Sequence, residues 1–273
     1  MRHLTRAPSA RDASASASTL KFVLLVFVLA IPFWLVGAVA GQRLLPGLPV
    51  VYALIAFCPL LAAVIRVRQE HGSVRALLAR TLDSWRIGWN WWYVPVVLLA
   101  PAVSITSYAI LRATHAPLPE SPHVPLLAAP VLFLGFLLGA VGEELGWTGY
   151  ATDRLRERWN PFQTGLILGV AWAAWHVPQL VQIGRAASWI GWWCAGTVAS
   201  RIVIVWIYER TGRSTFAAIV FHAVQNLCWQ LFPNRSSHWD PRLNALLLTC
   251  VVVVITLLRQ MQGSRSVLGR RPS

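Results

Sequence analysis

The run KFVLLVFVLAIPFWLVGAVA, residues 21–40, holds one charged side chain, Lys21, at its first position. Twenty residues of α-helix rise about 30 Å, which is the thickness of the hydrocarbon core of a bilayer. Comparable apolar runs recur along the 273 residues, of which 56% are hydrophobic and only 12% are charged. An ordinary soluble domain carries roughly 25% charged residues. The sequence therefore predicts an all-α protein, a polytopic transmembrane helical bundle.

The hydropathy pattern defines eight candidate spans. They cover residues 21–40, 49–65, 91–111, 126–146, 161–182, 189–208, 214–232 and 243–258. We interpret residues 20–260 as a single transmembrane domain between a disordered cytoplasmic N-terminal tail, 1–19, and a basic C-terminal tail, 261–273. The first run is longer than the core of a secretory signal peptide, so we expect a retained helix and not a removed leader.

The formal net charge is +14, which in a soluble protein would suggest nucleic acid as a partner. Here the basic residues lie between apolar spans, so we expect them to contact the lipid bilayer, and we expect no nucleic-acid partner. Lys and Arg number five in residues 66–90 and three in 147–160, but one in each of 41–48 and 112–125. The positive-inside rule then places both termini in the cytoplasm and predicts an integral protein of the cell membrane.

Residues 66–90 combine these arginines with tryptophans such as Trp85 and Trp89. Aromatic rings and basic side chains on one helix favour the water–membrane interface. We therefore expect residues 66–90 to form an amphipathic cytoplasmic helix that lies on the lipid headgroups.

Ionisable residues inside the predicted spans are few: Glu143, Glu144, His176, Arg201 and His222. A charged side chain at the centre of a bilayer costs about 3 kcal/mol even on insertion scales, so such residues indicate a functional site.

The two glutamates lie in LLGAVGEELGWTGY, residues 137–150. Adjacent residues of a helix point about 100° apart, so we expect Glu143 and Glu144 to have different neighbours, with Glu144 on the face of Thr148. Three glycines, Gly139, Gly142 and Gly146, would allow a partner helix to come close and bring donors to the carboxylates.

The histidines lie in two later motifs. His176, in AWAAWHVP, is the sixteenth residue of its span. His222, in FHAVQN, precedes Asn226 by four residues. Residues four apart share one face of a helix, so His222 and Asn226 suit a common ligand. Each motif taken alone is equally compatible with a polar contact between helices, or, for the glutamates, with the end of a span.

The three motifs together resemble a known family. Glu-Glu-xxx at 143–147, an aromatic-xxx-His at Trp172–His176 and His-xxx-Asn at His222–Asn226, in this order on separate spans, resemble the CPBP family of membrane proteins. This family includes CAAX prenyl endopeptidases and bacteriocin-processing or Abi-type proteins. The resemblance covers residues 139–230.

The resemblance implies a membrane-embedded endopeptidase whose catalytic core spans residues 126–232. It implies that Glu143 is the general base that activates a water molecule. His176 and His222 would position that water or a metal, Asn226 would stabilise the oxyanion, and Glu144 would support them. The implied substrate is a membrane-associated or lipidated peptide.

Two positions depart from the family pattern. The first motif usually ends in arginine, where this chain has Thr148, and the second usually begins with phenylalanine, where it has Trp172. The missing arginine is an expected partner of the glutamate pair. The sequence leaves open whether Arg201 or Arg154 takes its place.

Two histidines and a glutamate would also suit zinc with an open position for water. The sequence contains no HExxH, so a metal-independent site is favoured, with zinc held by His176, His222 and Glu143 as the alternative. A non-catalytic immunity or scaffold relative that binds peptides in the same cavity is an alternative function. A proton-coupled transporter is a third, against which the lack of inverted-repeat hydropathy counts.

Overall fold

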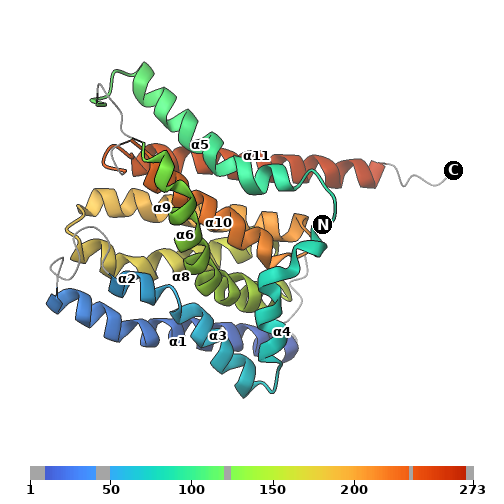
Figure 1. Cartoon of the computed structure of the whole chain (residues 1–273). Helices are drawn as coiled ribbons and strands as arrows, with labels where there is room; N and C mark the ends of the chain where they lie inside the picture. Colours follow the sequence, from blue (N-terminus) through green and yellow to red (C-terminus); the bar gives the residue numbers. More distant parts are fainter. Residues whose placement is uncertain (1–9, 41–49, 120–123, 234–235, 269–273) are drawn as a thin grey trace.

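The computed structural model describes residues 10–40, 50–119, 124–233 and 236–268. Within these ranges every regular element is helical, which confirms the all-α prediction (Figure 1). The elements are α1 (Ala10–Ala40), α2 (Val50–Ile55), α3 (Cys58–Gln69), α4 (Val74–Ala79), η2 (Arg80–Arg86), α5 (Tyr93–Ala113), η3 (Leu126–Ala128), α6 (Ala129–Gly146), η4 (Trp147–Thr152), α7 (Asp153–Arg156), α8 (Pro161–Gln182), α9 (Ala187–Arg210), α10 (Thr215–Leu231) and α11 (Pro241–Leu268).

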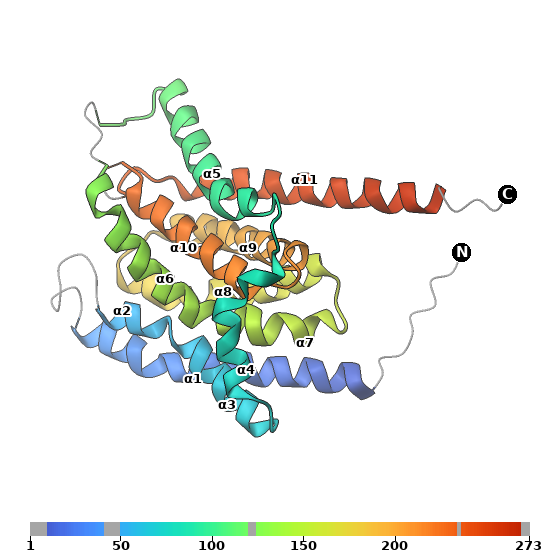
Figure 2. The same ribbon diagram turned by 45° about the vertical axis from the view of Figure 1, so that its right-hand side comes forward.

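Six helical segments of the described chain are long and apolar enough to cross a membrane. They are Ala17–Val39, Tyr93–Ala113, Leu126–Arg156, Pro161–Gln182, Ala187–Arg210 and Pro241–Met261. The two other predicted spans are present in a different form. Residues 49–65 are divided between α2 and α3, and residues 214–232 form α10, which has 17 residues and is about 26 Å long. Both run alongside the longer helices (Figures 1 and 2), so the predicted number of passes is approximate.

The division between α2 and α3 lies where this segment comes close to the backbone of α6. Pro59 occupies the first turn of α3, where its missing N–H costs no hydrogen bond. A Cβ atom at Gly142 would lie 2.6 Å from the carbonyl oxygen of Ala56, and one at Gly146 would lie 2.5 Å from that of Pro59. The predicted close approach is therefore confirmed at Gly142 and Gly146 but not at Gly139, where the nearest atom would lie 4.0 Å away. The α2–α3 segment makes this approach, and it brings backbone carbonyls and not donors to α6.

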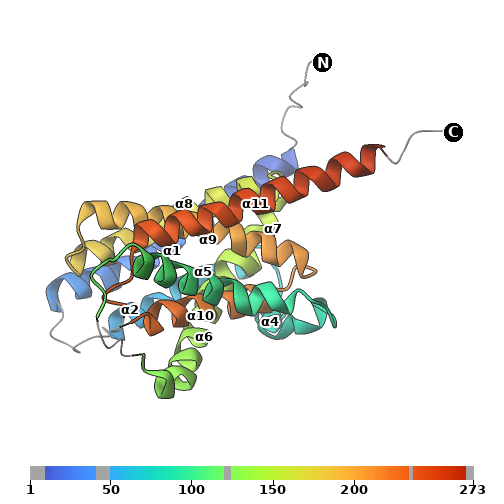
Figure 3. The same ribbon diagram turned by 90° about the horizontal axis from the view of Figure 1, so that it is seen from above.

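The segments predicted to share one side of the membrane lie at one end of the bundle. Figure 2 places the start of α1, α7 and the end of α11 toward this end, and Figure 1 shows α4 across the same helix ends. In Figure 3 α4 lies close to one end of α10. Hydrogen bonds join these segments, for example from Ser214 to the carboxylate of Asp83. That this end faces the cytoplasm remains a prediction.

The segment of α4 and η2 crosses the ends of the other helices and is amphipathic (Figure 1). Its inner face buries Leu77 and Asp83, whereas Leu82 is 70% exposed and Trp85 is 68% exposed. This is the arrangement expected for residues 66–90 at a membrane surface, although two short helices replace one continuous helix.

Both predicted tails are shorter than composition suggested. Helix α1 begins at Ala10, so residues 10–19 are helical where disorder was predicted, and α11 continues to Leu268, past the predicted start of the basic tail at residue 261. Residues 10–18 read ARDASASAS and contain neither proline nor glycine. A helix nucleated in the apolar run extends through such residues because each added residue gains a hydrogen bond. Residues 1–9 and 269–273 lie outside the described chain.

Candidate active site

The glutamate pair lies at the end of α6, immediately before a turn of π-helix. This turn, η4, covers Trp147–Thr152 and is entirely buried. The hydroxyl of Thr152 donates to the carbonyl of Trp147 at 2.9 Å, and Arg80 donates to the carbonyl of Gly149 at 2.6 Å. Single π-helical turns within α-helices occur frequently at functional sites.

Glu144 is completely buried, and both of its carboxylate oxygens are fully engaged. Two nitrogens of the Arg201 guanidinium donate to Oε2 at 2.7 Å and Oε1 at 3.0 Å. The hydroxyl of Thr148 donates to Oε2 at 2.5 Å, which confirms that these two side chains share a helix face. Nδ1 of His222 lies 2.8 Å from Oε1. A buried charge is tolerated only when it is paired in this way, so Glu144 has no oxygen left for a substrate.

Glu143 points to a different neighbour and is only partly engaged. It is 7% exposed, and its Oε2 accepts a hydrogen bond from the indole N–H of Trp172 at 2.6 Å. Within the described chain its Oε1 has no hydrogen-bond partner. A carboxylate that is held at one oxygen and unengaged at the other can accept a proton from a water molecule.

Trp172 is the residue on which the three motifs meet. Its ring lies edge-on to the imidazoles of His176 and His222, with centroids 5.5 Å and 5.2 Å away. Its N–H bonds Glu143, and the guanidinium carbon of Arg201 lies 4.0 Å from its ring centroid. The structure thus brings together four of the predicted site residues, from α6, α8 and α10: Glu143, Glu144, His176 and His222.

Each histidine uses Nδ1 to fix its ring. Nδ1 of His176 lies 2.8 Å from the backbone carbonyl of Trp172, and Nδ1 of His222 contacts the Glu144 carboxylate. A carbonyl and an ionised carboxylate can only accept, so both Nδ1 atoms carry the proton in this arrangement. The Nε2 atom of each imidazole is then the one available to a ligand.

Local sequence explains why α8 and α9 bring Trp172 and Arg201 into contact. Asn160 begins α8 with a reciprocal capping box to Gln163. A Cβ at Gly165 would lie 2.6 Å from Cα of Ile202, and one at Gly169 would lie 2.9 Å from Cα of Val198. These two glycines let the helices approach closely enough for a guanidinium on α9 to stack on an indole on α8.

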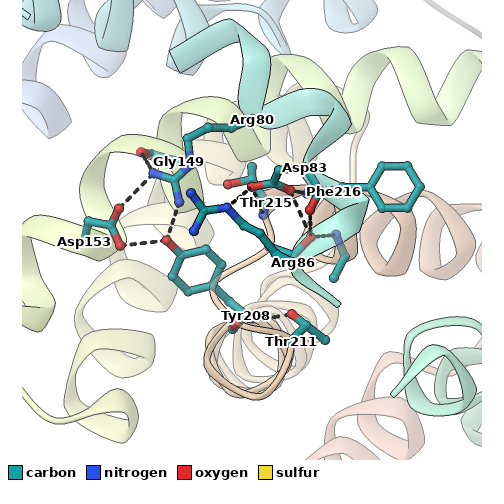
Figure 4. Close-up of polar contacts among 11 residues, drawn as sticks. Arg80, Asp83, Arg86, Gly149, Asp153, Tyr208, Thr211, Thr215 and Phe216 are labelled. Atoms are coloured by element: carbon teal, nitrogen blue, oxygen red, sulfur yellow. Dashed lines mark hydrogen bonds and ion pairs between the residues drawn. The ribbon is translucent and has the colours of Figure 1, made fainter. Parts of the chain in front are cut away.

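The start of α10 is held by Asp83 of η2, as Figure 4 shows. The carboxylate of this aspartate accepts from the backbone N–H groups of Thr215 at 3.2 Å and Phe216 at 2.9 Å, and from the hydroxyl of Ser214. Anionic acceptors satisfy the first N–H groups of a helix and its positive end. The helix that carries His222 therefore has its first turn fixed to the amphipathic segment.

Asn226 lies one turn beyond His222 on α10 and is half-buried. Its amide has no hydrogen-bond partner within the part of the chain that is described. Asn226 therefore lies on the helix that carries His222 but takes no part in the contacts around Trp172.

The described residues contain no group of three or more His, Cys, Asp or Glu side chains placed to hold one metal ion. The contacts described above engage Nδ1 of both histidines and Oε2 of Glu143, and they leave both Nε2 atoms and Oε1 open. The choice between a metal-independent site and zinc held by His176, His222 and Glu143 stays a prediction.

Sequence reasoning missed two members of this cluster. It treated Trp172 only as an aromatic substitute for phenylalanine, although tryptophan, unlike phenylalanine, carries an N–H donor. It left Arg201 and Arg154 as equal candidates to pair with the glutamates. Position within the span separates them, since Arg201 lies in mid-α9 whereas Arg154 pairs at the bundle end with Glu70.

Comparison with known proteins agrees with the motif pattern. Residues 125–228 match the family model of type II CAAX prenyl endopeptidase Rce1-like proteins. A CAAX prenyl protease 2 of Methanococcus maripaludis is 36% identical over 110 residues. That alignment covers 37% of this chain and 40% of the relative, so the chain spans less than half of the relative's length in the match. The resemblance to CAAX prenyl endopeptidases is confirmed over the segment that contains all three motifs.

Proposed function

We propose that this integral membrane protein is an intramembrane endopeptidase of the CAAX prenyl protease type, which hydrolyses a peptide bond in a membrane-associated substrate. The observation that carries the proposal is the meeting of Glu143, His176 and His222, from three different helices, at the ring of Trp172. The match of residues 125–228 to the Rce1-like model supports the same reaction class.

In this proposal Glu143 is the general base. A water molecule bound at its unengaged Oε1 gives a proton to the carboxylate as its oxygen attacks the peptide carbonyl carbon. The tetrahedral intermediate then collapses, the C–N bond breaks, and Glu143 returns the proton to the leaving amine. The hydrogen bond from Trp172 holds the carboxylate in place through both steps.

The histidines and Asn226 supply the remaining polar groups. The Nε2 atoms of His176 and His222 accept hydrogen bonds from the water and orient it, because their Nδ1 atoms carry the protons and are already engaged. The amide N–H of Asn226, on the same face as His222, donates to the developing oxyanion. Glu144 acts as a supporting carboxylate that fixes the ring of His222.

We propose that this reaction needs no metal ion. The proposal is supported by the unengaged Oε1 of Glu143, which a general base needs, and by the absence of an HExxH motif from the sequence. Prolonged dialysis against a strong zinc chelator should leave cleavage unchanged. Loss of cleavage that returns on adding zinc would show that the alternative zinc site is correct.

The proposed substrate is a peptide whose cleaved bond lies at a membrane, as a lipidated C-terminus does. The glutamates lie at the end of α6 that adjoins the amphipathic α4–η2 segment, so a bond near the headgroups is within reach. The matched relative is named a CAAX prenyl protease, and such substrates end in a prenylated cysteine followed by three residues.

The experiment uses purified protein in liposomes with two peptides of one sequence, one farnesylated at the cysteine and one not. Mass spectrometry of the products identifies the bond that is cut. Glu143→Ala and His222→Ala should abolish cleavage, whereas Glu157→Ala, which removes an exposed glutamate just beyond α7, should not. Preference between the two peptides decides the substrate class. Unchanged cleavage by the Glu143 and His222 variants would overturn the proposal.

The non-catalytic scaffold alternative rests mainly on Thr148, where the family has arginine. In the structure the guanidinium of Arg201 already pairs with Glu144 beside Thr148. The charge that Thr148 lacks is therefore present, and the main support for a non-catalytic role is weakened.

A further inference from the structure

Arg201 is a fully buried cation in the middle of a predicted membrane span. Its side chain is 0% exposed, as is that of Glu144, to which it is bound by two parallel hydrogen bonds. A charge in this position is costly to bury, and charged residues in membrane spans most often serve a function. The proposed mechanism does not use Arg201 at the reacting atoms.

The guanidinium of Arg201 contacts Glu144 directly and is linked to Glu143 through Trp172. Its donor atoms hold Glu144 directly, and its flat face lies over the ring of Trp172 at 4.0 Å. The N–H of Trp172 in turn holds Glu143 at 2.6 Å. A shift of Arg201 would therefore move Glu144 and the indole that orients the proposed base.

Position 148 lies beside the same carboxylate. The hydroxyl of Thr148 is 2.5 Å from Oε2 of Glu144 and 3.4 Å from a guanidinium nitrogen of Arg201. A short side chain at position 148 leaves space for the guanidinium that enters from α9. A long basic side chain at position 148 would reach the same carboxylate from η4.

We propose that Arg201 is a positioning residue for the proposed endopeptidase site. From α9 it supplies the cation that this site lacks at Thr148, and through Trp172 it keeps Glu143 aligned with its water. The inference rests on the proposed function and assigns Arg201 no contact with the substrate.

The test moves the charge instead of only deleting it. Arg201→Gln removes the cation, Arg201→Lys keeps the charge but loses the planar fork, and Thr148→Arg combined with Arg201→Gln returns a guanidinium from the neighbouring helix. Arg156→Gln is the matched control, because Arg156 also pairs with a glutamate, Glu209 at 3.0 Å, but lies on α7 away from the site. Each variant is assayed in liposomes for kcat, KM and unfolding temperature.

We expect Arg201→Gln to lower kcat about 100-fold, the size of effect that a misplaced catalytic group produces, with KM changed much less. Arg201→Lys should fall between it and the wild type. The Thr148→Arg/Arg201→Gln double variant should have a kcat about tenfold or more above that of Arg201→Gln, because the new guanidinium restores a charge-assisted hydrogen bond to Glu144. Arg156→Gln should keep the wild-type kcat.

The outcomes separate the two proposals. If the wild type cleaves and Arg201→Gln cleaves equally well while folded, the positioning role is wrong and the proposed function stands. If relocated charge restores the unfolding temperature but none of the lost kcat, Arg201 is only structural and the inference is also wrong. If the wild type cleaves no peptide, the proposed function fails and the inference fails with it.

Discussion

Glu143 and Glu144 are neighbours in sequence with opposite environments. Helical geometry turns one toward Trp172 and the other toward Arg201, His222 and Thr148. The saturated carboxylate of Glu144 can only hold its neighbours, whereas Glu143 keeps one oxygen for chemistry. At this scale the sequence predicted the divergence, because a rotation of about 100° per residue is intrinsic to the helix. It could not predict which partner each would meet, since that depends on helix packing.

The hydrogen bond from Trp172 to Glu143 gives a prediction for a single residue. Trp172→Phe keeps an aromatic ring, the residue usual in the family, but removes the N–H donor. A hydrogen bond to a charged group is worth about 2 kcal/mol. We therefore expect the unfolding temperature to fall by several degrees. We also expect kcat to fall by an order of magnitude or more, because the proposed base loses the donor that orients it.

Trp189→Phe provides the control for that substitution. The ring of Trp189 is tilted against that of Trp239, with centroids 5.9 Å apart, and it has no contact with the glutamates. Its kcat should match the wild type. A Trp172→Phe enzyme as fast as the wild type would show that the indole N–H does not orient the base.

At the scale of elements, the site depends on how closely α6, α8, α9 and α10 pack. The glycines of α6 were readable from the sequence as contact points, and the structure shows Gly142 and Gly146 pressed against backbone, whereas the close contacts of Gly165 and Gly169 in α8 were not predicted. The break between α2 and α3, the π-helical turn η4 and the shortness of α10 were not readable. Hydropathy reports apolar composition, which an interrupted helix and a continuous one share.

The α6 glycines allow a matched test of that packing. Gly146→Ala would place a Cβ 2.5 Å from the Pro59 carbonyl, so we expect a loss of about 1–3 kcal/mol of unfolding free energy. Gly139→Ala would meet only the Ala56 Cβ at 4.0 Å, and the better helix propensity of alanine should make it neutral or slightly stabilising. Thermal unfolding in detergent micelles measures both. Equal effects would mean that α6 does not contact α3 as described.

The Asp83 contact predicts that the amphipathic segment supports the site. Asp83→Ala leaves the first N–H groups of α10 unsatisfied, which costs about 2 kcal/mol and loosens the helix that carries His222. Asp240→Ala removes the equivalent acceptor at the start of α11, which carries none of the site residues.

We expect both aspartate variants to unfold at lower temperature, but only Asp83→Ala to lose activity at a temperature where both are folded. Activity assays beside circular dichroism distinguish the two effects. Full activity in folded Asp83→Ala protein would show that α10 holds its position without η2.

At the scale of the whole molecule, one carboxylate at the bundle end joins distant segments. Glu70, which follows α3, accepts hydrogen bonds from Ser18 of α1, Tyr150 of η4 and Arg154 of α7. Burial raises the pKa of Glu70, but these donors outweigh burial and lower the pKa below its ordinary value of 4.5. The ionised carboxylate is therefore the form that the fold favours.

That lowered pKa predicts how stability depends on pH. A group whose pKa is lower in the folded state stabilises the fold fully above its ordinary pKa, and loses that contribution as the pH falls through the folded-state pKa. The unfolding temperatures of the wild type and Glu70→Gln should therefore differ at pH 7 and converge as the pH falls through the folded-state pKa, which lies below 4.5. A difference that is equally large at pH 3 would show that ionised Glu70 does not stabilise the bundle.

The sequence predicted the all-helical membrane fold and the three motifs. It also predicted which connecting segments lie together at one end of the bundle. It did so because hydropathy, arginine spacing and motif order are local properties of the chain. It could not predict the contact of Arg201 with Trp172, because residues 29 apart on antiparallel helices meet only when glycines such as Gly169 set the helix distance. The helical extension of α1 over residues 10–19 was missed because a composition typical of disorder also permits helix beside an apolar span.

The most direct test of the central claim compares Glu143→Gln with Glu144→Gln in one liposome assay with parallel unfolding measurements. Glu143→Gln should unfold at the wild-type temperature and lose about 100-fold or more of kcat, because it removes only the base. Glu144→Gln should lower the unfolding free energy by about 3–5 kcal/mol, because it leaves Arg201 buried without its counter-charge. A Glu143→Gln protein that cleaves at the wild-type rate, or a Glu144→Gln protein as stable as the wild type, would contradict the account.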